Sequence, residues 1–463
     1  MIKTSLRHLY ALAFVVLAAC APIKVKAALD IEVLTTPAGF TVWHVEDHTL
    51  PLIAGQLIFR DAGATQDPAS KAGLATFVSG LLNEGAGDMD SRAFQARLDE
   101  LSIRLGFGAD RDRFTVSLAT LTENREEAFR LMGLAINRPR FDEDAVDRVR
   151  NQMLAMISQG DESPSTVARR IWYEAAYPDH PYGHPVEGTA ESVKHILRAD
   201  LQHFAKTRFA RDNVIIATVG DVGAEEIAAL VDRALSGLPD QAALVPVPPA
   251  EAAPPAGIRV IRRPIPQSTV YFGHNGIRRD SPDWYAAYVM NYVLGGGGFA
   301  SRLVNEVREK RGLAYSLASY FRPMDHGGLY VGAVGTQNER VAESIDVIRA
   351  EVVKMIEKGV TEEELSEAKT FLTGSYPLTF DTSRNIAAQL AAIQAEGFGP
   401  EYVKERNGFI EAVTLEEANA AAAKFLHPDQ LFWVVVGQPD GVEETAPVQA
   451  PVPASKRQAE KAE

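Results

Sequence analysis

Residues 295–316 of this 463-residue chain read Gly-Gly-Gly-Gly-Phe-Ala-Ser-Arg-Leu-Val-Asn-Glu-Val-Arg-Glu-Lys-Arg-Gly-Leu-Ala-Tyr-Ser. Ser301 is a residue type that begins helices, and the apolar residues behind it recur at helical spacing. Gly312 predicts the end of that helix, and a strand is expected to follow from residue 314 to residue 321. This order allows Arg308, in the last helical turn, and Tyr315, at the start of the strand, to converge on one point.

A second stretch, residues 73–85, reads Gly-Leu-Ala-Thr-Phe-Val-Ser-Gly-Leu-Leu-Asn-Glu-Gly. It resembles the zinc helix of the M16 peptidase family (insulinase or pitrilysin, processing-peptidase-like), which reads Gly-Leu-Ala-His-Phe-x-Glu-His-Met. Thr76, Ser79 and Gly80 stand where the family has histidine, glutamate and histidine. Hydroxyl groups are poor zinc ligands beside imidazole, and glycine has no side chain, so the resemblance implies a vacated metal site.

The family takes its last zinc ligand, a glutamate, from a helix further along the chain. The corresponding segment here is residues 149–157, in which Ala155 and Met156 fall where the family has glutamates. The resemblance therefore implies that all three ligands and the general base are missing. No cofactor is expected in this chain, and Zn²⁺ is expected in a partner subunit.

Residues 295–316 closely resemble the C-terminal signature of the same family, a glycine-rich loop followed by Arg-x6-Tyr. The resemblance implies that Arg308 and Tyr315 contact substrate near the zinc, where a guanidinium and a phenol O–H stabilise the oxyanion of peptide hydrolysis. Arg311 is a lesser candidate, because its spacing to Tyr315 differs from that of the family. The loop residues implied to contact substrate are Gly295, Gly296, Gly297, Gly298 and Phe299.

Two other interpretations of this segment stay open. The glycine run could be no more than a tight connection, with Arg308 a solvated helix residue. Phosphate binding is disfavoured, because neither Gly-Lys-Ser nor Gly-x-Gly-x-x-Gly follows a strand here.

Residues 105–109 match an exposed strand with which M16 proteins pair extended peptide. Backbone pairing needs no particular side chains, and small residues permit close approach. This resemblance implies substrate contacts at Leu105, Phe107 and Ala109.

The chain has the features of an internal duplication. In the first part a strand at 114–118 precedes helices at 124–136 and 141–157; in the second a strand at 328–333 precedes a helix at 339–356 and a capping box at Thr361. Both parts close with a loop and a buried strand that ends at Gly220 and Gly437. We expect an α+β fold of two homologous M16 metallohydrolase domains, each an antiparallel-rich sheet packed with helices, enclosing a chamber.

The expected domain limits follow from composition. A Pro-rich linker at 241–257 separates an N-terminal domain at 28–240 from a C-terminal domain at 258–440. The last segment, 441–463, is rich in Pro, Ala, Glu and Lys and is predicted to be a disordered tail.

Residues 1–27 are predicted to be a targeting segment, with Lys3 and Arg7 before a short apolar run. Cys20, the chain's only cysteine, ends a lipobox-like Leu-Ala-Ala-Cys and would be lipidated there. Alternatively, an ordinary signal peptide is cleaved after Ala27. Either alternative predicts export into the periplasm of a Gram-negative bacterium, with a membrane contact only through a lipid anchor.

Charge and the remaining histidines narrow the possible functions. The net charge of −14 disfavours nucleic acid as a partner. A metal site at His44 and His48 is disfavoured because the pair flanks a predicted turn, not a helix, and the pair His180 and His184 lies in a Pro- and Gly-containing loop. The isolated His274 and His326 are interpreted as core or surface residues.

Three hypotheses follow. The first is a zinc-less subunit of a heterodimeric M16 peptidase, inactive alone, that supplies substrate-binding and oxyanion-stabilising residues to a zinc-bearing partner and acts on unfolded peptides. The second is a non-enzymatic peptide-binding or scaffold subunit. The third is a self-sufficient hydrolase with an unrecognised site. The sequence leaves open the partner, the substrate and the choice between homo- and hetero-oligomer.

Overall fold

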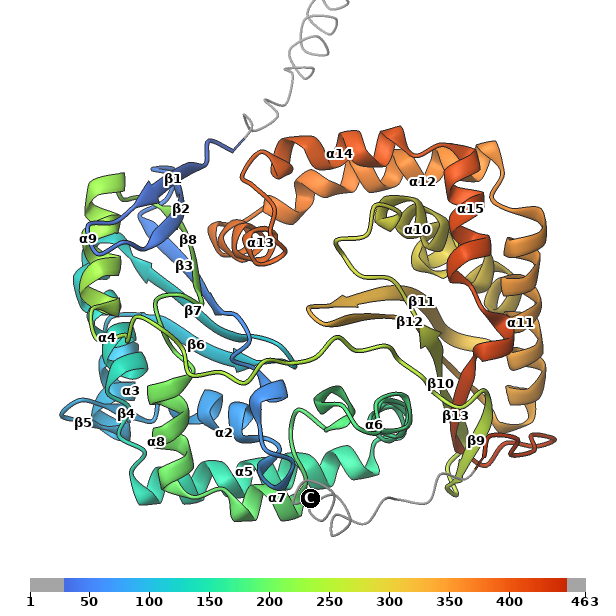
Figure 1. The fold of residues 1–463 in the computed structure, drawn as a ribbon, viewed down its shortest axis with the longest axis horizontal. Helices are drawn as coiled ribbons and strands as arrows, with labels where there is room; N and C mark the ends of the chain where they lie inside the picture. Colours follow the sequence, from blue (N-terminus) through green and yellow to red (C-terminus); the bar gives the residue numbers. More distant parts are fainter. Residues whose placement is uncertain (1–28, 448–463) are drawn as a thin grey trace, which may run out of the picture.

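The computed structural model describes residues 29–447 (Figure 1). Cys20 and the rest of the predicted targeting segment lie outside the described residues, as do residues 448–463. Within residues 29–447, no helix combines the length and the apolar character needed to cross a bilayer.

The first half is built on a mixed sheet with the strand order β1-β2-β8-β3-β7-β6. Strand β2 runs parallel to β8, and all the other neighbours are antiparallel. The strands are β1 (Glu32–Thr35), β2 (Thr41–Glu46), β3 (Leu52–Phe59), β6 (Arg104–Ala109), β7 (Phe114–Leu121) and β8 (Val214–Gly220). A separate short hairpin pairs β4 (Gly85–Ala86) with β5 (Met89–Asp90).

The second half repeats this pattern with the order β11-β12-β10-β13-β9. Here β9 runs parallel to β13 and the remaining pairs are antiparallel, so β9, β13, β10, β12 and β11 correspond in turn to β2, β8, β3, β7 and β6. These strands are β9 (Gly257–Arg262), β10 (Gln267–Asn275), β11 (Ala314–Met324), β12 (Gly327–Gln337) and β13 (Phe432–Gly437). The equivalence confirms the two homologous α+β domains expected from the sequence.

Helices cover the outer face of each sheet, as Figure 1 shows for α4 and α9 on one side and α11 and α15 on the other. The predicted capping box is present, because Thr361 Oγ1 accepts from the Glu364 amide at 3.2 Å and Glu364 Oε2 accepts from the Thr361 amide at 2.9 Å. First-half helices are α2 (Leu74–Leu81), α3 (Ser91–Glu100), α4 (Arg125–Asn137), α5 (Glu143–Glu162), α6 (Pro164–Ala176), α7 (Ala190–His195), α8 (Arg198–Thr207) and α9 (Ala224–Leu235). Second-half helices are α10 (Trp284–Asn291), α11 (Val341–Lys358), α12 (Glu362–Ser375), α13 (Ser383–Ala395), α14 (Tyr402–Ala412) and α15 (Leu415–Phe425).

The inner face of each sheet is covered by a helix from the other half. Helix α6 packs on β10 and β13, and the indole of Trp172 donates to the Phe432 carbonyl at 3.2 Å. Helix α13 packs on β3 and β8, where Leu390 is fully buried beside Ile58. Figure 1 shows both crossings, α6 beside β10 and β13, and α13 beside β3 and β8. This reciprocal exchange holds the two halves together.

The segments that the sequence assigned to a linker and a tail make definite contacts. Ala250 donates its amide to the His326 carbonyl at 2.7 Å, and both Ala250 and Ala252 are buried. Near the end of the chain, Thr445 Oγ1 accepts from the Ile258 amide at 2.9 Å, and Ala446 is buried against the second sheet. Within residues 441–447 only Val442 and Ala446 are buried, and the backbone amides of Thr445 and Ala446 donate to the Ile258 carbonyl of β9.

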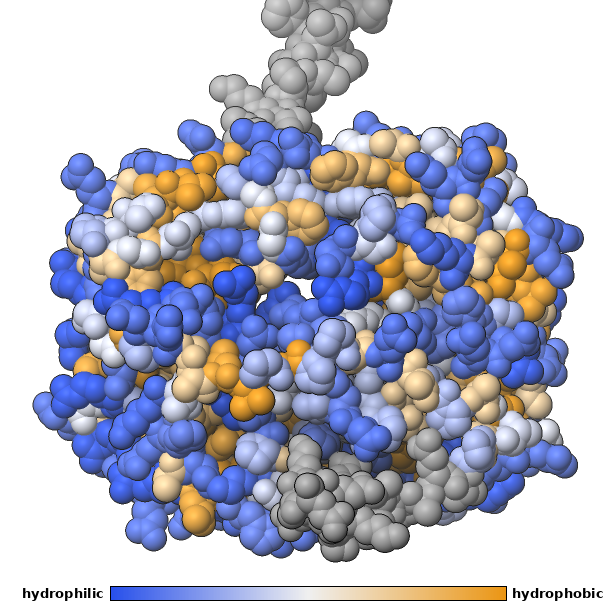
Figure 2. Space-filling model, viewed as in Figure 1, coloured by the Kyte–Doolittle hydropathy of each residue, from blue (hydrophilic) through white to orange (hydrophobic). Residues whose placement is uncertain are grey.

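The tips of two equivalent hairpins meet between the halves. Arg113, after the β6–β7 turn, forms a two-point ion pair with Asp325 in the β11–β12 turn, with distances of 2.6 and 3.1 Å. Asp112 accepts from the Asp325 amide at 3.2 Å. Figure 2 shows an opening near the middle of this face of the molecule, bordered mainly by hydrophilic residues.

Candidate functional site

Arg308 and Tyr315 converge as the sequence predicts. Arg308 lies in a π-helical turn, η7 (Val304–Glu309), and Tyr315 is the second residue of β11. The guanidinium carbon of Arg308 lies 5.6 Å from the centre of the Tyr315 ring and 4.6 Å from the centre of the Phe299 ring. Its Nε lies 3.5 Å from a carboxylate oxygen of Glu309. Two aromatic rings thus hold one cation in place.

The two aromatic side chains beside Arg308 are not part of a hydrophobic core. Tyr315 is 81% exposed and Phe299 is 68% exposed. The β11–β12 register shifts between Ala314 and Ser316, so Tyr315 lies at an irregularity of the kind that redirects a side chain. A phenol O–H and a guanidinium therefore face solvent together, where they are available to an acceptor oxygen.

The glycine run has a packing role that the sequence did not reveal. A Cβ on Gly295 would lie 2.2 Å from Ser319 Oγ, and one on Gly297 would lie 2.8 Å from the Tyr292 carbonyl oxygen. Gly298 has open space around it but adopts a φ of +56°. The run follows a second π-helical turn, η5 (Tyr292–Gly296), and brings Phe299 to the surface beside Arg308.

Two local details differ from the sequence expectations or refine them. Ser301 stands at the start of the helix, but its hydroxyl donates to the Gly298 carbonyl at 2.7 Å instead of capping the helix, because the glycine turn offers a nearer acceptor. Gly312 ends the helix with a φ of +61°, as predicted. Arg311 donates to the carboxylate and carbonyl of Glu306 at 2.6 and 2.7 Å, which directs it away from Tyr315.

The residues at the vacated metal positions form hydrogen bonds or packing contacts within the fold. On α2, the Thr76 hydroxyl donates to the Val186 carbonyl at 2.8 Å, and the Ser79 hydroxyl donates to the Thr76 carbonyl at 2.8 Å. A Cβ on Gly80 would meet a methyl group of Val149 at 3.0 Å, so α2 and α5 approach closely there. None of these groups is a free zinc ligand.

Residues 149–157, which correspond to the segment of the family's last zinc ligand, do not offer a suitable ligand either. Ala155 and Met156 lie on the exposed part of α5, and Met156 is 48% exposed. Within residues 29–447 there is no group of three or more His, Cys, Asp or Glu side chains arranged to hold a metal ion. An alanine and a thioether cannot replace a carboxylate at Zn²⁺, so the residues present do not fit the zinc site that the fold family implies.

Strand β6 ends the first sheet, with β7 on one side. Leu105 is buried, and Phe107 and Ala109 are half-buried. Among the described residues no strand pairs with the other edge of β6, which is the geometry that addition of an extended peptide needs.

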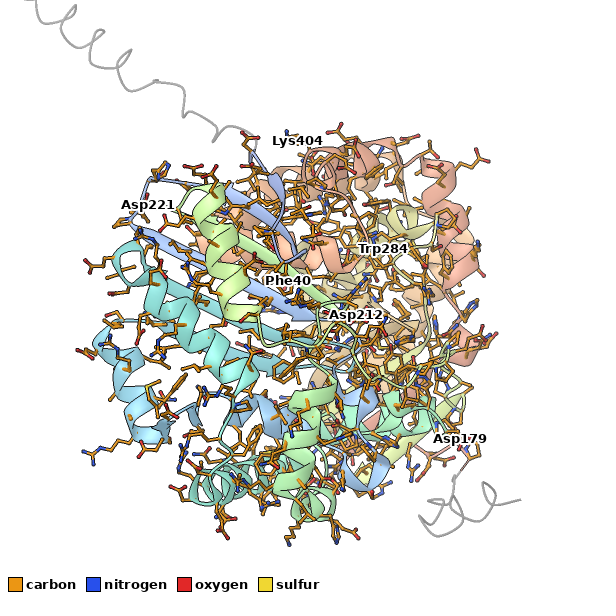
Figure 3. All side chains as sticks on the ribbon, turned by 60° about the vertical axis from the view of Figure 1, so that its left-hand side comes forward. Phe40, Asp179, Asp212, Asp221, Trp284 and Lys404 are labelled. Carbon is orange, nitrogen blue, oxygen red and sulfur yellow. The ribbon has the colours of Figure 1, made fainter. Side chains whose placement is uncertain are left out.

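The side chains of His44 and His48 are engaged in contacts within the fold. His44 is buried between Thr218 Oγ1 and the Val222 carbonyl, both at 2.9 Å, and burial lowers its pKa. His48 contacts Glu46 at 2.7 Å and Asp221 at 2.5 Å, and the Asp221 contact raises the pKa of His48. Asp221, labelled in Figure 3, lies at the outer rim of the first half.

Two further histidines behave differently from each other. His274 is buried, which lowers its pKa to about 4, and its Nε2 accepts from the His427 amide at 3.1 Å. His326 is not isolated as its sequence position suggested, because its Nε2 lies 3.1 Å from Asp61 of the first half. The sequence separation of the two residues hid this contact.

Comparison with known proteins agrees with this geometry. Residues 55–190 match the sequence pattern of the family described as "Insulinase (Peptidase family M16)", and residues 195–372 match that of the "Peptidase M16 inactive domain". The "Non-peptidase homolog YmxG" of Helicobacter pylori is 31% identical over 349 residues, which is 74% of this chain and 79% of that protein. The chain belongs to the M16 peptidase family.

Other M16-like proteins extend the comparison. An uncharacterized zinc protease of Mycobacterium tuberculosis is 28% identical, over 92% of this chain and 98% of its own length. The crystal structure of a peptidase M16 inactive domain from Pseudomonas fluorescens has a TM-score of 0.84 and 32% identity, covering 90% of this chain and all of that one. A protease structure from Helicobacter pylori, with a TM-score of 0.79 and 18% identity over 88% of this chain and 99% of that one, shares the fold. This chain is an M16 member without a recognisable metal site in its described residues.

Proposed function

We propose that this chain is the zinc-less subunit of a two-chain M16 peptidase and supplies Arg308 and Tyr315 to an active site whose zinc is held by the other chain. The observation that carries the proposal is the Arg308 cluster, in which two exposed aromatic rings flank one cation. Such an exposed cluster adds little to the stability of its own domain. By contrast, the residues at the positions of the metal ligands form hydrogen bonds or packing contacts within the fold.

The chemistry assigned to the cluster is limited to what its groups can do. The Tyr315 O–H and the Arg308 guanidinium are both donors, and both favour negative charge developing on a carbonyl oxygen. The edge of β6 would align an extended peptide by backbone hydrogen bonds. The chain supplies no nucleophile activation in this scheme; that belongs to the partner.

The test uses the full chain co-purified with a zinc-bearing M16 chain, ideally one encoded beside it. We expect peptide cleavage by the pair and none by either chain alone. Arg308→Ala should lower the rate by about 100- to 1000-fold, the usual cost of losing an oxyanion donor. Arg311→Ala is the matched control and should leave the rate within about twofold of the unchanged pair, since surface substitutions away from a site have small effects. An active pair that is unaffected by Arg308→Ala contradicts the proposal.

A second candidate is a non-enzymatic peptide-binding or scaffold subunit. It is favoured by the missing ligands and by similarity to a protein named a non-peptidase homolog. Stable peptide binding without cleavage, in every combination with zinc-bearing M16 chains, would select it. One equivalent of zinc per isolated chain, with chelator-sensitive cleavage, would instead select a self-sufficient hydrolase.

We also propose that the protein acts in the periplasm, as the predicted targeting segment suggests. Intact-mass measurement of the mature chain separates the alternatives: a diacylglyceryl-modified N-terminus at Cys20 indicates a lipoprotein, and an unmodified chain starting at Ala28 indicates ordinary signal cleavage. An unprocessed chain starting at Met1 in the cytoplasm contradicts export.

A further inference from the structure

A cavity of about 320 Å³ lies where helices of the first half meet strand β11 of the second. Its walls include Met156 of α5, Arg169 and Tyr173 of α6, and Arg322 of β11. It adjoins the vacated metal positions through Val186, whose carbonyl holds the Thr76 hydroxyl. The volume is at the lower end of the range for small-ligand sites.

The cavity carries more positive than negative charge. Its lining has four arginines and two carboxylates. Arg170 is paired with Asp161 at 2.6 Å outside the lining set, and Asp110 accepts from the backbone amides of Asp112 and Arg113 at 2.8 and 2.7 Å. The neighbouring cavity of about 410 Å³ shares Asp110, Arg111 and Arg322 with this one, but six arginines and six carboxylates balance over its whole lining.

Three arginines of the lining have no carboxylate within ion-pair distance among the described residues: Arg111, Arg169 and Arg322. Arg111 donates through Nε to the Tyr182 carbonyl at 3.2 Å, and its guanidinium lies 3.8 Å from the centre of the Tyr173 ring. Burial is the main cause that lowers the Arg111 pKa, and Arg322 and Arg169 lower it further. Asp110 and Glu187 lie in the same lining without forming ion pairs with these arginines, so the cavity keeps an excess of positive charge.

Buried hydroxyl donors lie beside these cations. The phenol oxygens of Tyr173, Tyr177 and Tyr271 have no hydrogen-bond partner, although these residues are only 1%, 2% and 7% exposed. The Tyr173 ring packs against Tyr177 and Trp172, and Trp172 in turn packs against Tyr271. Burial raises the pKa of Tyr177 and of Tyr271, so both keep their protons. Of these three residues only Tyr173 belongs to the cavity lining, and its hydroxyl oxygen is enclosed by protein atoms, so it is the arginines that face the space.

We propose that this cavity is an oxyanion-binding site, in which the guanidinium groups of Arg111 and Arg322 supply both the positive charge and the hydrogen-bond donors for a carboxylate. A guanidinium only donates hydrogen bonds, and a carboxylate or phosphate offers several acceptor oxygens at once. Given the volume, the occupant is the free C-terminal carboxylate of a short peptide, with inorganic phosphate as the other source of the same chemistry. The site lies in this chain alone, so it does not depend on a partner subunit or on Arg308.

The test is calorimetric titration of the full mature chain with three probes: N-acetyl-trialanine with a free carboxylate, the same peptide as its C-terminal amide, and inorganic phosphate. We expect the acid to bind about 10- to 100-fold more tightly than the amide, the usual worth of hydrogen bonds to a charged group. Equal affinities, or no binding of any probe, overturn the proposal. Phosphate binding without peptide binding supports the oxyanion site and assigns it to phosphate.

Substitutions in the cavity lining test whether the peptide binds there. Arg322→Gln should weaken the acid peptide by about tenfold or more, whereas Arg92→Gln, the same charge change at an exposed position of α3, should not. Tyr173→Phe removes a hydroxyl that has no partner and is enclosed by protein atoms, so neither the melting temperature nor the peptide affinity should fall. Unchanged affinity in Arg322→Gln places the binding elsewhere and overturns the assignment.

Discussion

The segments between β3 and β6 in the first half and between the equivalent strands β10 and β11 in the second invite a direct comparison, because they occupy equivalent places in the duplicated fold. In the first half this segment is α2, where Thr76, Ser79 and Gly80 have become part of the structure through hydrogen bonds and close packing. In the second half it is the glycine run and the η7 turn, which leave Phe299 and Tyr315 exposed around Arg308.

This difference distinguishes residues with a structural role from residues that are available to a ligand. The polar group of a residue with a structural role forms a hydrogen bond within the molecule, as the Thr76 hydroxyl does. A residue kept for a ligand is positioned by the fold but left without a partner for its polar end, as Tyr315 is. The predictions below test this distinction, beginning with the contacts on which both halves depend.

Leu390→Ala should have the largest effect on stability. Leu390 of α13 is fully buried on the inner face of the first sheet, so the substitution leaves a cavity and should cost about 2–5 kcal/mol of unfolding free energy. Leu378→Ala, at a position that is 73% exposed, is the control and should change stability by less than about 0.5 kcal/mol. Urea unfolding of both variants gives the comparison; a small loss for Leu390→Ala would mean that the halves fold independently of the exchanged helix.

The junction of the two hairpins should be sensitive to pH. Burial raises the pKa of Asp112 to about 6 from an ordinary 3.8, and the nearby Asp325 charge adds to the shift. Because the folded state holds this proton more tightly than the unfolded one, Asp112 stabilises the fold most below pH 4, and that stabilisation is lost as pH rises toward 6 and above. The loss is up to about 3 kcal/mol.

Asp112→Asn isolates this effect. The amide can still accept from the Tyr182 hydroxyl, which lies 2.8 Å from Asp112 Oδ1, but it does not titrate. The free energy of unfolding of the variant relative to the wild-type chain should therefore rise between pH 4 and pH 7. A difference that is flat across this range would show that Asp112 ionises normally.

Within the glycine run, Gly295→Ala should destabilise the chain while Gly298→Asn should not. The new methyl group at 295 would overlap Ser319, and overpacking of this kind costs about 1–3 kcal/mol. Position 298 has open space and a left-handed backbone that asparagine tolerates. Thermal unfolding of the two variants measures the contrast, and equal melting temperatures would show that β11 yields to accommodate residue 295.

The smallest effects on stability are expected at Thr76 and Tyr315, the side chains compared above. Thr76→Val removes the hydrogen bond to the Val186 carbonyl and should cost about 0.5–1.5 kcal/mol. Tyr315→Phe removes an exposed hydroxyl and should change stability by less than about 0.5 kcal/mol, although the proposed function requires it to lower activity in the two-chain peptidase. Chemical denaturation distinguishes the pair; a larger stability loss at Tyr315 than at Thr76 would reverse the comparison.

Much of the fold could be predicted because its signals are local. The strand predicted at 114–118 lies within β7 at Phe114–Leu121, and the helix predicted at 124–136 is α4 at Arg125–Asn137. The capping box at Thr361 was predicted by residue type and spacing alone. The convergence of Arg308 and Tyr315 was also predictable, because one helix end and one strand start fix both residues.

Other features gave no local signal. The contact of His326 with Asp61 joins residues 265 positions apart, and the exchange of α6 and α13 depends on which sheet each helix meets. The cationic cavity was missed because Arg111 looks like an ordinary charged turn residue and Arg322 like an exposed strand residue. Only the packing of the halves brings both arginines into one cavity.

The sequence by itself determined the repeated α+β halves and the pairing of Arg308 with Tyr315, because periodicity and short spacings are sufficient for each, and its resemblance to the M16 family indicated the missing zinc ligands. The tertiary structure alone decided that each half covers the inner sheet of the other, that Gly295 packs closely against β11, and that arginines without ion pairs gather around one cavity. These depend on contacts between residues far apart in the chain, whose energies are settled by the burial and partners that the complete fold provides.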